Sequence, residues 1–241
     1  MLVPDLVKAA DKLEATHPDV AGSIRAIRDI NSIRVDLSHA FNFAQNMNAM
    51  SDEAQQAQAN TAIEIAHHAL LLGAIVLYSR AMKTRSDHRK TFDFRPRLTE
   101  QEREMHDQIC GLRDDAVAHF GPGFQIGTAG FQTDGLFLAP SNEADGALRL
   151  MSVSRRTVVH KGFGARLLEH LRSTSLLVQK EFEDRETKLM DRLNQLGGSR
   201  EVQEALQSST TDLAEYMSSL ELAELVFDAN QIGPLVAVTN H

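Results

Sequence analysis

Apolar residues at helical spacing over long stretches of the chain are the feature that most restricts its fold. From Val20 to Met50 they recur every three or four positions, at Ile24, Ile27, Ile30, Ile33, Leu37, Phe41, Ala44 and Met47. The same spacing returns from Phe163 to Leu196. Such periodicity puts the apolar side chains on one face and predicts two long helices. At about 1.5 Å per residue the second would be roughly 50 Å long, so we expect part of it to pack on another subunit.

Shorter helical segments complete the pattern. They are expected at Leu2–Ala15, from Ser51 to about Met82, from near Leu98 to just after His119, and from about Arg200 to Asp228. Thr99 and Glu102 have the spacing of a capping box, which marks a helix start. Gly121-Pro122-Gly123 stops the same helix. The sequence therefore predicts an all-α bundle of five or six helices.

Between residues 124 and 159 the period changes. The short apolar runs there are separated by the turn signals QTDG and SNEADG. This pattern favours a small antiparallel β-meander of two or three strands. We expect it to be an insertion in one helical domain spanning residues 1–241, with long C-terminal helices over about 163–228.

The charge balance gives no general affinity for a polyanion. The chain of 241 residues carries 25 Lys and Arg against 33 Asp and Glu, a formal net charge of −8. One segment departs from this balance, because Arg80–Arg97 holds seven Lys or Arg against two Asp. The segment is either a solvated helix end and loop or a surface facing phosphates. In the second case the RNA-binding residues would be Arg80, Lys83, Arg85, Arg89 and Lys90.

Other features of the sequence favour a reducing cytoplasm. Cys110 is the only cysteine, so it has no partner for an intramolecular disulfide. The first twenty residues lack the basic and apolar regions of a secretory signal. The longest apolar run, Ala69–Tyr78, is about half of the ~20 residues that span a bilayer. We expect that run to be the buried middle of a core helix and expect no membrane association.

One short motif carries the functional argument. Arg113 is followed directly by the polar residue Asp114 and, five positions later, by His119 near a helix C-terminus. This arrangement resembles the arginine, polar residue and histidine signature of the HEPN superfamily. The resemblance covers the motif helix and, as architecture only, the helices from about residue 20 to 120. The meander and the C-terminal helices do not match the family pattern.

The resemblance implies a helical bundle that dimerises so that two motif helices face each other. Many HEPN proteins are metal-independent ribonucleases, some of them in toxin and antiviral-defence systems, and others are non-catalytic structural or binding modules. Carried onto this chain, it makes His119 the general acid or base and Arg113 the phosphate-binding cation, with Asp114 as the polar residue beside it. RNA, a second copy of the chain and a protein antitoxin or operon partner are the implied partners.

The chemistry of these residue types agrees with that role. Cleavage of RNA without a metal needs groups that move protons and a cation that stabilises the phosphorane. The helix macrodipole and Asp115, four residues before His119, both favour the protonated imidazole. Arg113 and His119 lie about 120° apart around an ideal helix. They therefore converge only across a dimer, or if the helix unwinds near Ala118.

Other interpretations stay open. Arg113 and Asp114 are also typical of a solvated helix surface, and His119 of a residue that only complements the helix dipole. The acidic balance favours a non-catalytic dimeric binding or scaffold module. Glu64 and His67 have the spacing used in helical di-iron sites, but no second Glu-x-x-His motif accompanies them. We therefore predict no metal site and no cofactor.

Overall fold

The computed structural model describes residues 2–50, 62–83, 86, 89–114, 125–126, 129–130, 132–140, 148–156 and 161–212. The chain divides into two compact units. The first consists of residues 1–38, 85–92 and 175–241, and the second of residues 39–84 and 93–174. The predicted single domain over residues 1–241 stays a prediction.

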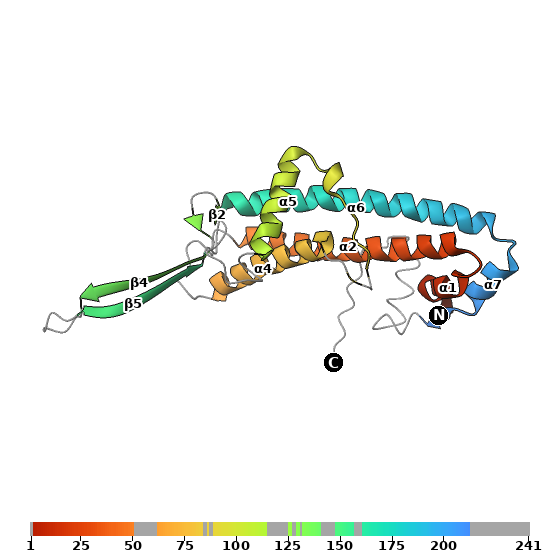
Figure 1. Ribbon diagram of the computed structural model, residues 1–241, viewed down its shortest axis with the longest axis horizontal. Coiled ribbons are helices and arrows are strands. Elements are labelled where there is room, and N and C mark those ends of the chain that lie inside the picture. The colour runs from red at the N-terminus through yellow and green to blue at the C-terminus, as the bar shows by residue number, and fades with distance from the viewer. Residues whose placement is uncertain are drawn as a thin grey trace. The chain divides into compact units, whose positions relative to one another are not determined.

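The described part of the chain is mostly helical and contains six α-helices (Figure 1). These are α1 (Leu6–Leu13), α2 (Pro18–Ala49), α4 (Ala62–Lys83), α5 (Glu100–Leu112), α6 (Lys161–Gln195) and α7 (Arg200–Gln207). A 3-10 turn, η1 (Arg95–Arg97), precedes α5. The all-α prediction is confirmed at this level. One expected helix starts within residues 51–61 and another ends within residues 115–124. Both ranges lie outside the described residues.

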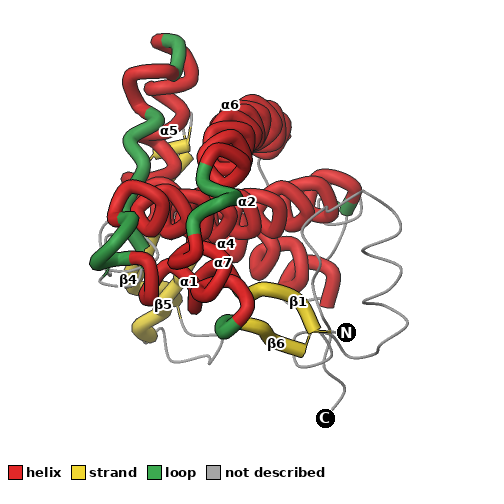
Figure 2. The backbone as a smooth tube through the Cα atoms, turned by 90° about the vertical axis from the view of Figure 1, so that its right-hand side faces the viewer, coloured by secondary structure: helices red, strands yellow, loops and turns green. Residues whose placement is uncertain are grey.

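Both ends of the described chain differ from the prediction. Residues Leu2–Pro4 form strand β1 instead of the first turn of a helix, and they pair antiparallel with β6 (Thr210–Asp212), as Figure 2 shows. Helix α1 begins only after Asp5, whose carboxylate accepts hydrogen bonds from the backbone N–H groups of Val7 and Lys8. Helix α7 ends at Gln207, well before the predicted Asp228, because the chain turns there into β6.

The inserted region contains antiparallel strands, as predicted, and the described strands form two separate pairs instead of one sheet. β2 (Gln125–Ile126) pairs with β3 (Ala129–Gly130), and β4 (Gln132–Pro140) pairs with β5 (Leu148–Arg156). Only residue 131 separates β3 from β4.

Each unit has apolar side chains at its centre. In the first unit α1, the start of α2, the end of α6 and α7 pack together through Ala10, Leu13, Val20, Ala21, Ile24, Leu189, Val202 and Ala205. In the second unit the buried apolar side chains include Met47, Leu71, Ile75, Ile109, Phe163, Leu167 and Leu171. The helical spacing of the apolar residues in the sequence accounts for these contacts.

Two glycines allow close helix packing in the second unit. A Cβ atom on Gly73 of α4 would lie 2.5 Å from the Phe43 ring of α2. A Cβ atom on Gly164 of α6 would lie 2.5 Å from the side-chain oxygen of Asn48, whose amide donates to the Gly164 carbonyl at 2.9 Å. These contacts fix α4 and the start of α6 against α2.

Helix α4 is the one described helix that is long and apolar enough to cross a membrane. Its most apolar window of 18 residues has a mean hydropathy of 1.5, and 33% of that window is buried within the protein. Within the run that was predicted to be buried, Leu71, Ala74, Ile75 and Tyr78 are fully or almost fully buried, whereas Val76 is 39% exposed. The prediction therefore holds for one face of the helix. Core helices pass the same test, so length and composition alone are weak evidence for a membrane span.

Candidate functional site

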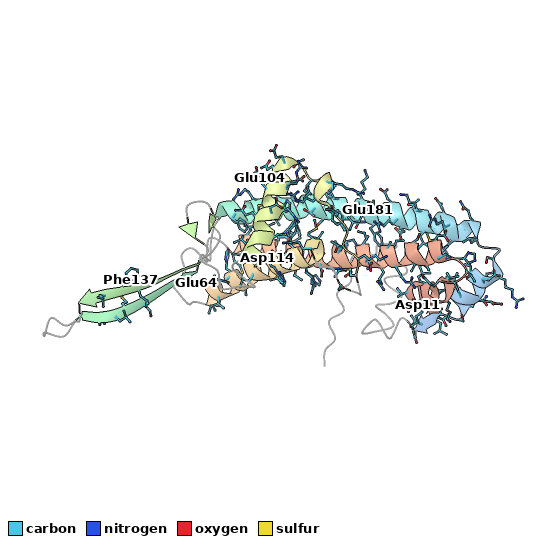
Figure 3. All side chains as sticks on the ribbon, in the orientation of Figure 1. Asp11, Glu64, Glu104, Asp114, Phe137 and Glu181 are labelled. Carbon is cyan, nitrogen blue, oxygen red and sulfur yellow. The ribbon has the colours of Figure 1, made fainter. Side chains whose placement is uncertain are left out.

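The first two residues of the predicted motif contact the basic end of another helix. Arg113 follows the last residue of α5, and Lys83 is the last residue of α4. The Asp114 carboxylate accepts a hydrogen bond from Lys83 Nζ at 2.8 Å and one from an Arg113 terminal nitrogen at 2.8 Å. Asp114 is labelled at this end of α5 in Figure 3. The structure thus brings together Arg113 and Asp114, which the sequence suggests as motif residues, and Lys83, which it suggests as an RNA-binding residue of the basic segment.

The charges in this cluster support one another. Hydrogen bonds from Lys83 and then Arg113 hold the pKa of Asp114 below its ordinary value, and the hydrogen bond to Asp114 raises the pKa of Lys83. Lys83 and Asp114 are therefore both ionised at neutral pH. The side chains of Lys83 and Arg113 are 49% and 48% exposed, and that of Asp114 is 38% exposed. Both cations can therefore contact a solute from the solvent side.

The backbone at the start of the motif continues the hydrogen bonding of α5. The Arg113 N–H lies within reach of the carbonyls of Cys110 and Ile109, three and four residues earlier. Arg80, one helical turn before Lys83 on α4, is exposed on the same side of that helix.

The other predicted RNA-binding residues belong to the first unit. The Arg89 guanidinium donates to Asp36 at 2.7 Å and to the Ser32 hydroxyl at 3.2 Å, and the side chains of Arg89 and Asp36 are 11% and 6% exposed. The backbone N–H of Lys90 donates to Asp29 at 3.0 Å. Arg89 therefore has a structural role, which gives no support to the RNA-binding role predicted for it.

Several predicted residues lie outside the described part of the chain. They are His119, the proposed acid or base, its neighbour Asp115, and Arg85 of the basic segment. Their roles stay predictions. For the alternative metal site, the described residues contain no group of three or more His, Cys, Asp or Glu side chains that would hold a metal ion.

Sequence reasoning missed a buried polar network in the second unit. The Tyr78 hydroxyl of α4 lies 2.8 Å from His106 Nδ1 of α5 and 2.7 Å from His170 Nε2 of α6. On the far side of the His106 ring, Nε2 lies 3.9 Å from Cys110 Sγ. The four-residue spacing of His106 and Cys110 was visible in the sequence. The contact of Tyr78 with His170, 92 positions away, was not.

Burial dominates the protonation of this network. It lowers the pKa of His170 to about 4, lowers the pKa of His106, and raises the pKa of Cys110 to about 11. At neutral pH both imidazoles are therefore uncharged and Cys110 is a thiol. A thiol with a raised pKa is a poor nucleophile, so this network is not a cysteine-based catalytic centre.

No protein-family model, curated protein or solved structure matches the chain. The resemblance to the HEPN superfamily therefore depends on Arg113, Asp114 and His119 and on the helical architecture.

Proposed function

We propose that the chain is a HEPN-like, metal-independent endoribonuclease of the toxin or antiviral-defence type, active as a homodimer. The observation that supports this most is that Lys83 and Arg113 both form ion pairs with the Asp114 carboxylate. Two half-exposed cations at one point match the requirement for stabilising a phosphate that gains negative charge during cleavage. Arg113 is also the first residue of the motif to which the family resemblance assigns phosphate binding.

In the proposed reaction the RNA 2′-oxygen attacks the adjacent phosphorus and the bond to the 5′-oxygen breaks. His119 either accepts the 2′-hydroxyl proton or donates a proton to the leaving 5′-oxygen, and solvent water makes the other transfer. Arg113 and Lys83 bind the non-bridging phosphate oxygens. Exposed ion pairs contribute little net energy, so a phosphate can compete with Asp114 for both cations.

The same proposal includes the setting and the partners. The protein acts in the cytoplasm, where its single cysteine, buried Cys110, stays reduced. Its partners are RNA, a second copy of the chain, and a protein antitoxin or operon partner that controls cleavage. The reaction uses no cofactor.

Cleavage of RNA by purified protein in EDTA tests the proposal. We expect His119→Ala to reduce the rate about 10²- to 10⁴-fold, as for loss of a general acid or base. Arg113→Ala should cost about 10²-fold or more, as for loss of a charge-stabilising donor, and Lys83→Ala less. Arg172→Ala, which removes an exposed arginine of α6, is the matched control and should cut like wild type.

The products give a second readout. Cleavage should leave 2′,3′-cyclic phosphate ends, and an oligonucleotide lacking the 2′-hydroxyl at the cut position should resist. Equal cutting by wild type and the His119 and Arg113 variants, or no cutting by any of them, would reject the nuclease.

A second candidate is a non-catalytic dimeric helical module that binds or scaffolds another molecule. Lys83 and Arg113 form ion pairs with Asp114, and Arg89 forms one with Asp36. The cations predicted to bind phosphate are thus already paired within the protein, which favours this candidate. Binding to RNA through phosphates weakens steeply with salt. Ligand binding that is insensitive to salt, together with no RNA cleavage, would favour this module over the nuclease.

A further inference from the structure

The first unit contains a cavity of about 370 Å³, within the range of small-molecule sites. One wall is a single face of α2, and the other walls come from the segment before η1 and from α6, which runs beside α2 (Figure 1). All of its lining residues belong to this unit. Those used below from the three walls are Pro18, Gly22, Ala26 and Asp29, then Lys90 and Phe92, and then Arg185.

Arg185 presents a guanidinium that is held in place but only partly hydrogen-bonded. Its Nε donates to Glu181 at 2.6 Å, and its carbon atom Cζ lies 5.0 Å from the centre of the Phe92 ring. One outer nitrogen is 3.5 Å from the Ala26 carbonyl, and the other has no acceptor among the described residues. A guanidinium has five N–H donors, so this arrangement leaves donors for an anion. The side chain is 27% exposed, so a solute can reach it.

Lys90 supplies a second cation at the same cavity. Its backbone N–H donates to the carboxylate of Asp29 at 3.0 Å, which fixes this point of the chain against α2. The Asp29 side chain is 8% exposed and also pairs with Arg28 at 2.8 Å. The Lys90 side chain is exposed, and its ammonium group makes no ion pair or hydrogen bond with the described residues.

The charges that line the cavity favour an anion with a single negative charge. Arg25, Lys90 and Arg185 line it together with Glu14 and Asp29, one more positive than negative charge. Arg25 forms ion pairs with Glu14 and with Asp11. The cations with donors left for a ligand are therefore Lys90 and Arg185, and an opposite charge is attracted to them.

Gly22 marks the place for the rest of the ligand. A glycine in the interior of a helix lowers its stability, and a Cβ atom on Gly22 would meet nothing within 4 Å. Packing within the protein therefore does not require a glycine here, whereas close approach of a ligand to the backbone does. Pro18 on the same face is exposed, and Ala26 and Phe92 are half-buried, so accessible apolar surface surrounds Gly22.

We propose that this cavity binds a small monocarboxylic acid with an apolar body. Its carboxylate accepts hydrogen bonds from the outer nitrogens of Arg185 and from the Lys90 ammonium group, because a planar guanidinium matches the geometry of a carboxylate. The apolar body lies on the face of α2 around Gly22 and against Phe92. The site belongs to the first unit and is independent of the proposed nuclease, whose cluster at Asp114 belongs to the second.

Calorimetric titration of the full-length protein with 4-phenylbutyrate tests the site at constant ionic strength. The matched probes are 4-phenylbutan-1-ol, which lacks the charge, and acetate, which lacks the apolar body. We expect 4-phenylbutyrate to bind about tenfold or more tightly than either. Lys90→Gln should weaken its binding about two- to fivefold, the range for exposed ion pairs. Lys188→Gln removes an exposed lysine of α6 outside the lining and should bind like wild type.

Gly22→Leu provides the second test, because it fills the space that the ligand needs. Binding of 4-phenylbutyrate should fall about tenfold or more, as expected when a site is overfilled. The urea midpoint should stay the same or rise, because leucine favours the helix and its Cβ meets no neighbour. Loss of binding by a protein of unchanged or higher stability is the result that a structural role of Gly22 would not give.

The proposal is overturned if 4-phenylbutyrate does not bind, or if the alcohol or acetate binds as tightly. It is also overturned if Lys90→Gln or Gly22→Leu binds like wild type, or if Lys188→Gln weakens binding as much as Lys90→Gln. RNA cleavage does not enter any of these readouts.

Discussion

Tyr78 joins two buried imidazoles in the second unit, and their burial makes the stability of the protein depend on pH. A buried imidazole loses its hydration when it becomes charged, so burial favours the neutral ring. His170 is affected most, because its pKa falls to about 4, and the neighbouring His106 ring disfavours its charge further. The pKa of His106 is also lowered, first by burial.

The free energy of unfolding should therefore fall as the pH drops from about 6.5 to about 4. In this window the unfolded chain, with an ordinary histidine pKa of 6.5, binds protons that folded His170 does not. His170 alone accounts for about 3 kcal/mol across the window. Urea unfolding at several pH values measures the change.

The variant His170→Gln provides the comparison. It should be less stable at neutral pH, because the network is cut, but its stability should depend less steeply on pH than that of wild type. A wild-type stability that stays constant or increases between pH 7 and pH 4.5 would contradict the burial of a neutral His170.

At this scale the sequence predicted the chemistry of single residues better than their contacts. Arg113, Asp114 and Lys83 were named as functional candidates, but nothing in the sequence placed Lys83 on Asp114. Arg89 was assigned to a phosphate surface, whereas it binds Asp36, 53 positions earlier. Pairing between distant residues depends on how helices pack, and a local pattern contains no information about that.

At the scale of elements, the hairpin of β4 and β5 differs most from the helices. Its described apolar side chains are exposed on both faces: Leu136, Leu138 and Leu150 on one face, and Phe137 and Met151 on the other. Each face follows from the register, in which Leu138 pairs with Leu150 and Phe137 with Met151. The core helices, in contrast, bury their apolar stripes.

This contrast predicts very different costs for two leucine substitutions. Leu171→Ala on α6 removes a side chain that is 0% exposed and should lower the free energy of unfolding by about 2–5 kcal/mol. Leu138→Thr removes a side chain that is 69% exposed and should change it by less than about 0.5 kcal/mol. Chemical denaturation of the two variants measures both. If Leu138→Thr costs as much as Leu171→Ala, the hairpin is covered in solution.

Element types were easier to predict than element ends. The two long helices follow directly from apolar spacing, and the predicted capping box of Thr99 and Glu102 is confirmed, since each side chain binds the other's backbone N–H. The strand Leu2–Pro4 could not be predicted, because it exists only through pairing with Thr210–Asp212 at the other end of the described chain. A pattern of three residues carries no signal for so distant a partner.

At the scale of the whole molecule, the proposed reaction depends on a second copy of the chain. His119 lies six positions after Arg113, and on an ideal helix that spacing places the two residues about 120° apart. A site assembled from Arg113 of one subunit and His119 of the other removes this difficulty. Such a composite site occurs twice in a symmetric dimer.

Mixing two inactive variants tests this central claim most directly. Arg113→Ala and His119→Ala each lack one half of both composite sites, but a heterodimer of the two retains one complete site. After subunit exchange in equal amounts, statistical pairing predicts RNA cleavage in EDTA at roughly a quarter of the wild-type rate. A mixture no more active than the separate variants, while wild type cuts RNA and the subunits demonstrably exchange, would contradict the account.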